Sequence, residues 1–197
     1  MEYINKVSTL YIRKFKRKLG QYNVPMPLPD YFEKMIGEKK SVRIAEVGSG
    51  PINTIGNYWL PDVKVEIIAS DILQHQYEKL WKEYGATPIV PIEYQDMENM
   101  AYPDESFDIV HCVNALDHTE YAASAIGECR RICKKVGWVY FRHSPNQKSR
   151  FKGNHYWDIR YEDGKCMFYG TGVKFQLLPE FKVSLEKNLI VATWQKT

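Results

Sequence analysis

The sequence has no apolar run near the roughly 18 residues that a membrane span needs, and no apolar signal-peptide segment near its start. It has only four cysteines, and their spacing does not follow a disulfide framework. A net charge of +3 is too small to favour a charged partner by itself. These absences argue against a membrane-spanning or disulfide-stapled protein, and they predict a cytoplasmic one.

What the sequence does have is a short apolar stretch, residues 42–47, that runs into a turn at Gly48 and Gly50. Near-continuous apolar strands are typical of parallel sheets whose two faces are both covered. Paired glycines let the backbone turn sharply and approach a ligand closely. A dinucleotide-binding turn has a third glycine where this chain has Asn53, and the carboxylate of Glu46 is poorly suited to phosphate. The turn therefore favours a cationic, amine-bearing ligand.

A second β-branched run, residues 65–70, ends in Asp71. In open α/β sheets, an acidic residue at the end of the second strand accepts hydrogen bonds from the ribose hydroxyls of a bound nucleoside. Together with the glycine turn, Asp71 predicts a site for adenosine joined to a positively charged group.

On these residues the chain resembles the class I S-adenosylmethionine-dependent methyltransferases, in their broad small-molecule group. The resemblance covers residues 42–143; each motif alone is weak, but their order is specific. The matching segments are Glu46–Gly50, Asp71, Gln95–Met97, Pro103–Val110 and Glu128–Gly137. The third glycine often found in the family's first motif is replaced, so the start of the next helix is expected to be irregular.

The resemblance implies S-adenosyl-L-methionine as the cofactor and S-adenosyl-L-homocysteine as its product. It implies that Asp96 accepts from the adenine amino group and that the Met97 amide pairs with a ring nitrogen. Without the other motifs, Asp96 would be read as a turn or cap residue. The implied cofactor site comprises Glu46, Gly48, Ser49, Gly50, Asp71, Ile72, Asp96, Met97 and Asn114.

Residues 114–118 follow the fourth expected strand, where the family places the chain against the transferable methyl group. Methyltransferases that act on base or amide nitrogens usually carry Asn/Asp-Pro-Pro-Tyr/Phe there. This chain has Asn-Ala-Leu-Asp at residues 114–117, which makes that class of enzyme less favoured. His118 is the predicted general base, because imidazole titrates near neutrality; alternatively it only orders the loop. Four further histidines are ranked lower, with His143 and His155 as weaker candidates and His75 and His111 as structural residues.

No metal ion is expected. Catechol-type metal-dependent methyltransferases need an Asp-Asn pair after the fifth strand, where this chain has residues 143–146, His-Ser-Pro-Asn, so we predict no magnesium. Cys129 and Cys133 fall one helical turn apart, but no histidine pair accompanies them in the sequence.

The predicted architecture is a single α/β domain over residues 1–197, with a Rossmann-like, doubly wound, mostly parallel seven-stranded sheet and an antiparallel C-terminal strand. Its parts are an N-terminal helical cap (1–40), a cofactor-binding core (41–144) and a substrate-side region (145–197). Expected strands are 42–47, 63–69, 89–94, 107–113 and 138–143; expected helices are 52–60, 74–84 and 119–135. Caps are expected at Asp30 and Thr119, and helix ends at Gly37 and Gly137.

Residues 2–19 carry an apolar stripe at helical spacing and a basic opposite face, and Gly20 is predicted to end this helix. Solvation is the simpler interpretation of the basic face; a contact with an acidic substrate, nucleic acid or another subunit is the alternative. Because family members often place an N-terminal helix over the methionine end of the cofactor, Tyr11 and Tyr22 are candidate lid residues.

The C-terminal region is predicted to hold two strand pairs. Asp163-Gly164 is a strong hairpin signal between residues 156–161 and 165–169. Residues 181–185 and 189–194 resemble the antiparallel strands that close the family's sheet. The first hairpin looks like an addition, and its aromatic residues, Tyr156 and Trp157 among them, either form a wall of a substrate pocket or cover the sheet edge.

The main hypothesis is methyl transfer from S-adenosylmethionine to a small molecule, with oxygen slightly favoured over nitrogen. One alternative is a methyltransferase-like cofactor-binding or regulatory subunit that acts through its basic N-terminal helix. Another is an RNA or DNA methyltransferase. The sequence identifies neither the acceptor nor the oligomeric state.

Overall fold

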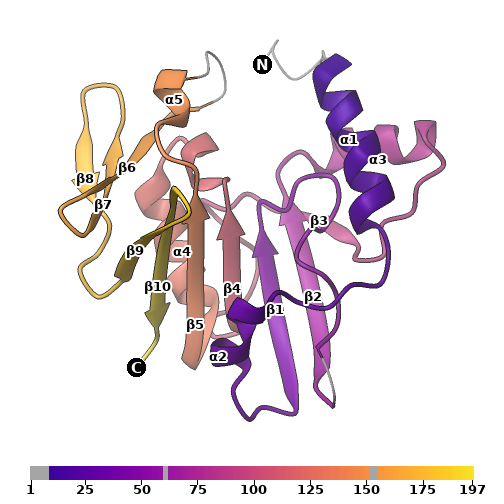
Figure 1. The fold of residues 1–197 in the computed structure, drawn as a ribbon, viewed down its shortest axis with the longest axis horizontal. Coiled ribbons are helices and arrows are strands. Elements are labelled where there is room, and N and C mark those ends of the chain that lie inside the picture. The colour runs from indigo at the N-terminus through magenta and orange to yellow at the C-terminus, as the bar shows by residue number, and fades with distance from the viewer. Residues whose placement is uncertain (1–8, 60–61, 151–154) are drawn as a thin grey trace.

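A seven-stranded sheet, in the order β3-β2-β1-β4-β5-β10-β9, forms the centre of the molecule (Figure 1). The computed structural model describes residues 9–59, 62–150 and 155–197. β1 to β5 pair in parallel, and β10 is antiparallel to both of its neighbours, which confirms the predicted sheet. The strands are β1 Ser41–Val47, β2 Lys64–Asp71, β3 Ile92–Tyr94, β4 Phe107–Val113, β5 Cys133–His143, β9 Lys182–Glu186 and β10 Leu189–Gln195.

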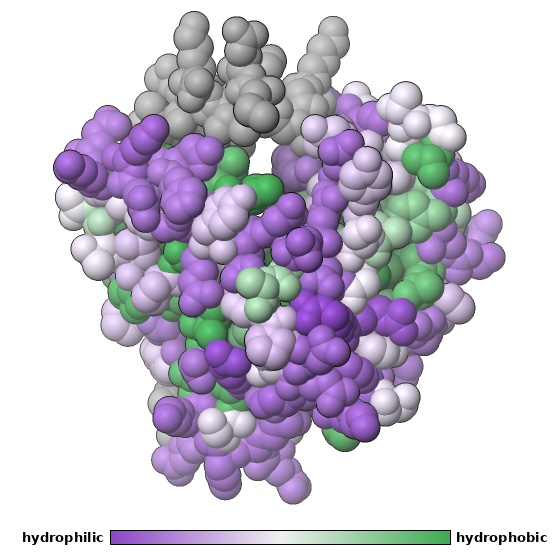
Figure 2. All heavy atoms as spheres, turned by 180° about the vertical axis from the view of Figure 1, so that it is seen from behind, coloured by the Kyte–Doolittle hydropathy of each residue, from purple (hydrophilic) through white to green (hydrophobic). Residues whose placement is uncertain are grey.

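Helices cover both faces of this sheet. They are α1 Thr9–Tyr22, η2 Asp30–Phe32, α2 Glu33–Ile36, α3 Gln74–Glu83, η3 Leu116–His118, α4 Ala122–Ile132 and α5 Gln147–Arg150. In Figure 1, α2 lies in front of the sheet and α4 behind it. Figure 2, the view from behind, shows a mostly hydrophilic surface on which hydrophobic residues form small separate groups.

The side chains of β1 explain its near-continuous apolar sequence. Ala45 and Val47 belong to the hydrophobic layer that contains α4, whereas Val42 and Ile44 belong to the opposite layer with η2 and α2. Successive residues of a strand point to opposite faces, and here both faces are covered. No helix among the described residues has the length and hydrophobicity to cross a membrane.

The helix predicted over residues 52–60 is wrong. In its described part this segment forms turns and isolated bridges, one of them between Tyr58 and Pro27. The Asn53 side chain accepts from the Ile55 amide. Gly56 has a φ of +85°, and a Cβ at this position would collide with the Pro27 carbonyl. Pairing with the proline-rich segment therefore replaces helical hydrogen bonds.

The predicted end of the first helix is also wrong, because α1 continues through Gly20 to Tyr22. Residues 2–8 of the predicted helix lie outside the described residues. A glycine inside a helix costs about 1 kcal/mol relative to alanine, which does not stop a helix that is anchored elsewhere. α1 is anchored by Phe15, which packs in one cluster with Ile52 and Tyr77.

α4 begins and ends differently from the prediction. The Thr119 hydroxyl donates to the Leu116 carbonyl (2.7 Å), and it is the Glu98 carboxylate that accepts from the Glu120 and Tyr121 amides (2.6 and 3.1 Å) before the helix starts. Asp30 likewise does not cap its helix, since no side-chain bond forms at the start of η2.

Gly137 lies within β5 and does not end α4, because α4 stops at Ile132 and β5 begins at Cys133. A register shift between β4 and β5, together with a φ of +61° at Val136, marks a β-bulge here. A Cβ at Gly137 would lie 2.9 Å from the Asp108 carbonyl oxygen. The glycine therefore permits the bulge to pack.

The predicted extra hairpin is confirmed and gains a third strand. β6 (Asp158–Glu162) and β7 (Lys165–Tyr169) flank Asp163 and Gly164, whose positive φ values suit a tight hairpin turn. β8 (Lys174–Gln176) pairs with β7 and was not predicted. This small sheet shares the hydrophobic layer that contains α4.

Arg131, in the last turn of α4, holds the loop that precedes β4. Its guanidinium donates to the carboxylates of Glu128 (2.7 and 2.8 Å) and Asp104 (2.8 Å). It also donates to the carbonyl oxygens of Met100 (2.9 Å) and Tyr102 (2.7 Å). One side chain thus fixes the entry into the strand whose end carries the candidate site.

We expect Arg131→Ala to lower the free energy of unfolding by about 2–3 kcal/mol, because it leaves several charged and backbone groups unpaired. The matched control is Arg130→Ala, which removes an exposed ion pair with Glu180 (2.7 Å) and should cost less than about 1 kcal/mol. Urea denaturation measures both. Equal losses would contradict the bracing role of Arg131.

Candidate functional site

The glycine turn after β1 is held by the end of β2. The Gly48 and Ser49 amides donate to the Ser70 carbonyl (2.8 and 3.0 Å), and the Gly50 amide donates to Asp71 Oδ2 (2.9 Å). Both glycines have a φ near +70° (70° and 71°), a conformation that side chains rarely adopt. The predicted turn and the predicted ribose-binding carboxylate are therefore brought together.

The two glycines serve different purposes. A Cβ at Gly48 would lie 2.3 Å from the Cβ of Ala115 and 3.1 Å from Met97 Cε. Gly48 is thus needed for packing among the loops that follow β1, β3 and β4. At Gly50 the nearest atom to such a Cβ is Lys18 Nζ, 3.9 Å away. The space above Gly50 is therefore bounded by α1.

Asp71 is a structural acceptor as well as a ligand candidate. Its Oδ1 accepts from the Leu73 amide (2.9 Å) and the Tyr77 hydroxyl (3.3 Å). Burial raises the pKa of Asp71, and these hydrogen bonds act in the opposite direction. The charge of His118 also lowers the pKa of Asp71, which places the predicted base within electrostatic reach of the nucleoside side of the site.

Glu46 is the most unusual group at this edge of the sheet. Its side chain accepts from the Thr54 amide, yet Oε2 is buried without a hydrogen-bond partner among the described residues. Burial raises the pKa of Glu46 to about 8, and the Lys18 charge partly offsets this shift. A buried acceptor without a donor is costly. A cationic ligand with N–H donors would satisfy it, so the residues fit the ligand that the sequence predicts.

Lys18 is a residue that the sequence analysis did not single out. Its ammonium lies above Gly50 and acts electrostatically on Glu46. The available signal was the basic face of the first helix, but its pattern does not say which lysine faces the glycine turn. Of the two predicted lid residues, the Tyr11 side chain lies outside the described part of the chain. Tyr22 is half-buried and contacts the hydrophobic cluster that contains Phe15.

The predicted adenine-binding residues lie where β2 and β3 end. Ile72 is 50% exposed, which is unusual for a large aliphatic side chain and leaves it available as one wall of a site. Asp96 Oδ1 accepts from the Glu98 amide (2.9 Å), so Asp96 forms a turn. Met97 is buried beside Gly48. Their roles toward a cofactor stay predictions.

Asn114 joins the ends of β4 and β5. Its amide donates to the Arg142 carbonyl (2.9 Å), and its side-chain oxygen accepts from the Ser144 amide (2.8 Å). Its φ of +52° turns the chain sharply out of β4. The segment that follows is therefore held over the carboxyl ends of both strands.

A cluster of three histidines surrounds the buried carboxylate of Asp117 in η3. His155 Nδ1 lies 2.7 Å from Asp117 Oδ2, whereas His118 Nε2 and His143 Nδ1 lie 4.0 and 3.9 Å from Oδ1. The rings of His118 and His155 are 4.3 Å apart. Burial lowers the pKa of His143 to about 4, so its ring is neutral at pH 7. All three histidines ranked as catalytic candidates thus meet at one acidic residue.

The segment that leads into the small sheet of β6, β7 and β8 places His155 in this cluster. The Tyr156 and Trp157 amides donate to the Asp117 carbonyl (2.7 and 3.3 Å), and Trp157 Nε1 donates to the Thr119 carbonyl (2.9 Å). Trp157 is buried in the core, whereas Tyr156 is exposed. Of these two predicted substrate-side residues, Tyr156 is therefore the one whose side chain is accessible to a substrate. Asp117 was missed as the centre of the cluster because the sequence does not show that residues 155–157 pair with it.

The other two histidines lie elsewhere. His111 is buried, and its Nε2 lies 3.0 Å from the Tyr31 hydroxyl in a stack with Tyr140. Burial lowers the pKa of His111 to about 3. His75 stacks on Tyr94. Neither takes part in the cluster around Asp117.

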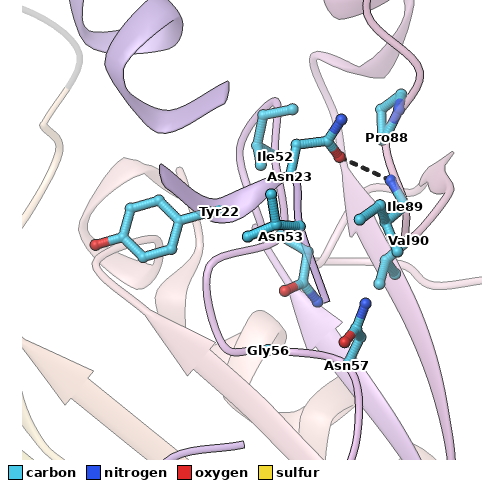
Figure 3. A pocket seen from close by; sticks show the side chains of 10 residues that line it. Tyr22, Asn23, Ile52, Asn53, Gly56, Asn57, Pro88, Ile89 and Val90 are labelled. Carbon is cyan, nitrogen blue, oxygen red and sulfur yellow. Dashed lines mark hydrogen bonds between the residues drawn. The ribbon is translucent and has the colours of Figure 1, made fainter. Parts of the chain in front are cut away.

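The pocket in Figure 3 does not coincide with these groups. Its walls come from the end of α1, the loop after β1 and the segment before β3, and the Asn23 side chain accepts from the Ile89 amide across it (2.8 Å). Its volume is about 10 Å³, room for about one water molecule. It is therefore a packing gap and no cofactor site.

Comparison with known proteins agrees with this geometry. A family model described as a methyltransferase domain matches residues 45–141. The chain is 44% identical over 41 residues to a ubiquinone biosynthesis O-methyltransferase of Thiobacillus denitrificans, covering 21% of this chain and 17% of that protein. It is 38% identical over 53 residues to the corresponding enzyme of Paracidovorax citrulli, covering 25% and 22%. These matches span about a fifth of each relative.

A solved structure shows the same fold over nearly the whole chain. A candidate S-adenosyl-L-methionine-dependent methyltransferase from Methanococcus maripaludis superposes with a TM-score of 0.60 at 15% identity, covering 98% of this chain and 95% of that one.

The two glycines of the turn give a matched pair of variants. We expect Gly48→Ala to lower the free energy of unfolding by about 3 kcal/mol or more, because it combines left-handed backbone strain with overpacking against Ala115. Gly50→Ala adds only the strain, about 1–2 kcal/mol. Chemical denaturation of both variants compares them, and an equal or reversed order would show that the loops do not pack as described.

Proposed function

The chain belongs to the class I S-adenosylmethionine-dependent methyltransferases, and from this premise we propose that it methylates an oxygen, or less readily a nitrogen, of a small-molecule acceptor. The observation that carries the proposal is the buried Oε2 of Glu46 beside the glycine turn, which has no hydrogen-bond partner among residues 9–59, 62–150 and 155–197. A sulfonium cofactor with an α-amino group supplies the missing donor and the positive charge at once. S-adenosyl-L-homocysteine leaves as the product.

Each part of the cofactor has a partner of matching chemistry at this edge. Glu46 would receive the ammonium group, and Asp71, which already shapes the turn, would receive the ribose hydroxyls. Ile72 offers an exposed apolar wall for adenine, next to Asp96 and Met97. The remaining charge of the cofactor is its carboxylate, and Lys18 is the cation that lies above the turn.

Methyl transfer from a sulfonium needs alignment above all. The reaction is an in-line displacement, and orientation alone can supply about 7–11 kcal/mol of barrier lowering. The acceptor would lie beside η3, next to the cluster around Asp117. His118 belongs to this cluster and also acts electrostatically on Asp71, the proposed ribose ligand. A base near neutral pKa adds roughly 10²–10⁴-fold for a hydroxyl acceptor, which is the role predicted for His118.

A small-molecule oxygen acceptor is favoured by two observations. The segment after β4 lacks the Asn/Asp-Pro-Pro-Tyr/Phe sequence of enzymes that methylate base or amide nitrogens. The partial relatives are O-methyltransferases of ubiquinone biosynthesis, although only about a fifth of their length is matched. A cytoplasmic location is part of the same proposal.

Calorimetric titration with S-adenosylmethionine and S-adenosylhomocysteine tests the cofactor site, and release of S-adenosylhomocysteine with a panel of phenols, catechols and amines tests the acceptor. We expect binding of both nucleosides and turnover with hydroxyl acceptors. Binding without any turnover would support a regulatory subunit. Salt-sensitive RNA or DNA binding with methylation would support a nucleic-acid enzyme. Absence of nucleoside binding would refute the proposal.

Because the pKa of Glu46 is raised to about 8, its carboxyl is largely protonated in the free protein at pH 6. A cationic cofactor binds the ionised form, so we expect its affinity to rise by up to tenfold per pH unit between about pH 6 and 7.5, below the α-amino pKa. Glu46→Gln should bind weakly and with little pH dependence. Calorimetry over this range checks both, and a flat wild-type profile would argue against the contact.

The same shift affects folding of the free protein. A carboxyl whose pKa is raised from 4.5 to about 8 contributes its full stability below pH 4.5 and loses it as the pH rises through 8. Glu46→Gln removes this loss, so we expect the variant to be more stable than the wild type above pH 8. Thermal unfolding at several pH values checks the sign.

Lys18→Ala should weaken S-adenosylmethionine binding by about 10–100-fold, since a hydrogen bond to a charged group is worth about 1.5–3 kcal/mol. Decarboxylated S-adenosylmethionine should lose less affinity than S-adenosylmethionine, because Lys18 would affect it only through the ionisation of Glu46. Lys16→Ala is the control on the same helix, because Lys16 lies over the Tyr84 ring. If Lys18→Ala weakened both ligands alike, the carboxylate contact would be rejected.

A further inference from the structure

We propose that Asp117, His118 and His155 bind a divalent transition-metal ion, with zinc as the best match. One ligand atom from each residue lies within 4.8 Å of those of the other two. The three come from η3 and from the segment before β6, so the fold brings together residues that are distant in the sequence. The role given below to the ion rests on the proposed methyl transfer, whereas the binding itself does not.

The donor set selects the kind of ion. Zinc is bound by imidazole nitrogen and carboxylate oxygen, and catalytic zinc sites use three protein ligands and keep a further position open. Two histidines with one carboxylate also serve other transition metals. Magnesium prefers oxygen ligands, so the proposal keeps the expectation of no magnesium site but departs from the broader expectation that the chain binds no metal ion.

The buried carboxylate is a second and independent sign of a cation. Asp117 is 2% exposed, and its Oδ1 has no hydrogen-bond partner among the described residues. Burying a carboxylate oxygen away from water without a hydrogen-bond donor costs free energy. Buried charges are therefore usually paired or bound to a metal. The histidines nearest to Oδ1, His118 and His143, stand about 4 Å from it (4.0 and 3.9 Å), too far for a hydrogen bond.

The ligands are held before any ion arrives. Asp117 and His118 are consecutive in η3, and the backbone of residues 156 and 157 donates to the Asp117 carbonyl, which fixes the position of His155. His155 Nδ1 already contacts Asp117 Oδ2 at 2.7 Å. The His143 ring, buried behind the carboxylate, is placed as an outer partner of the kind that orients metal-binding carboxylates.

The His118 side of the cluster is partly exposed. The side chain of His118 is 45% exposed, while that of Asp117 is buried, so an ion would enter from the solvent side and keep a position there. His118 also acts electrostatically on Asp71, so the cluster lies near the proposed cofactor site. The open position is therefore available to an acceptor oxygen.

In this role a bound divalent ion lowers the pKa of a hydroxyl that binds it. The acceptor O–H bond breaks and its proton passes to solvent; the oxygen then forms a bond to the methyl carbon while the carbon–sulfur bond breaks. The sulfur keeps the electron pair and leaves as a neutral thioether. His118 acts here as a ligand and not as the general base that the sequence predicts.

The test of binding uses the metal-free protein, residues 1–197, without cofactor, titrated with Zn²⁺ by calorimetry and with Co²⁺ by visible absorption. We expect one equivalent to bind and the Co²⁺ spectrum to show nitrogen and oxygen coordination. His155→Ala and His118→Ala each remove a direct ligand, so each should weaken binding by at least the roughly 10–100-fold that loss of an outer partner costs. His75→Ala, which removes an exposed histidine that stacks on Tyr94, should leave binding unchanged.

Absence of binding, or binding that survives both His155→Ala and His118→Ala, would overturn the proposal. Because no cofactor is present, this result is independent of whether the chain binds S-adenosylmethionine. For the catalytic role, chelation should abolish S-adenosylhomocysteine release without weakening S-adenosylmethionine binding, and Zn²⁺ should restore it. Activity that persists in chelator would reject the role of the ion in favour of His118 as a base.

Discussion

The site depends on the buried carboxyl group of Glu46, whose Oε2 has no hydrogen-bond partner in the part of the chain that the structure describes. Its own strand is covered on both faces, and its pKa of about 8 shows how strongly burial opposes its ionised form. The neighbouring elements hold this costly group in place. The glycine turn that follows Glu46 is itself held by Ser70 and Asp71. Binding a cation removes the penalty, so the cost of ionising this buried carboxyl group favours a cationic ligand.

The glycine turn after β1 also links the proposed cofactor site to the cluster around Asp117 by direct packing. Gly48 packs against Ala115, the residue that leads into η3. The position of Asp117 and His118 therefore depends on the backbone of the glycine turn. Asn114 ties that segment to the end of β5. In-line transfer requires this kind of rigidity, since a shift of about 1 Å in alignment is enough to cost a large part of the rate.

Local patterns predicted much of this fold, and long-range contacts account for most of the misses. The strand at 107–113 agrees residue for residue, because a short β-branched run between turn signals needs no distant information. The helix expected at 52–60 failed because Gly56 packs on Pro27. The cap expected from Thr119 comes from Glu98. In the site, Glu46 and Asp71 were predictable from their places near the ends of their strands, whereas Lys18 and the His155–Asp117 pair depend on tertiary packing.

The added three-stranded sheet is best understood through what it contributes to the site. It shares a hydrophobic layer with α4, and Trp157, buried in that layer, donates to the Thr119 carbonyl just beyond η3. A segment anchored in this way can place His155 beside Asp117 with the accuracy of a core contact, although it lies outside the family's common motifs. Chemistry grafted onto a shared fold is expected to be carried by such additions. The part of the chain that the family resemblance explains least is therefore the part that would shape the environment of the acceptor in the proposed reaction.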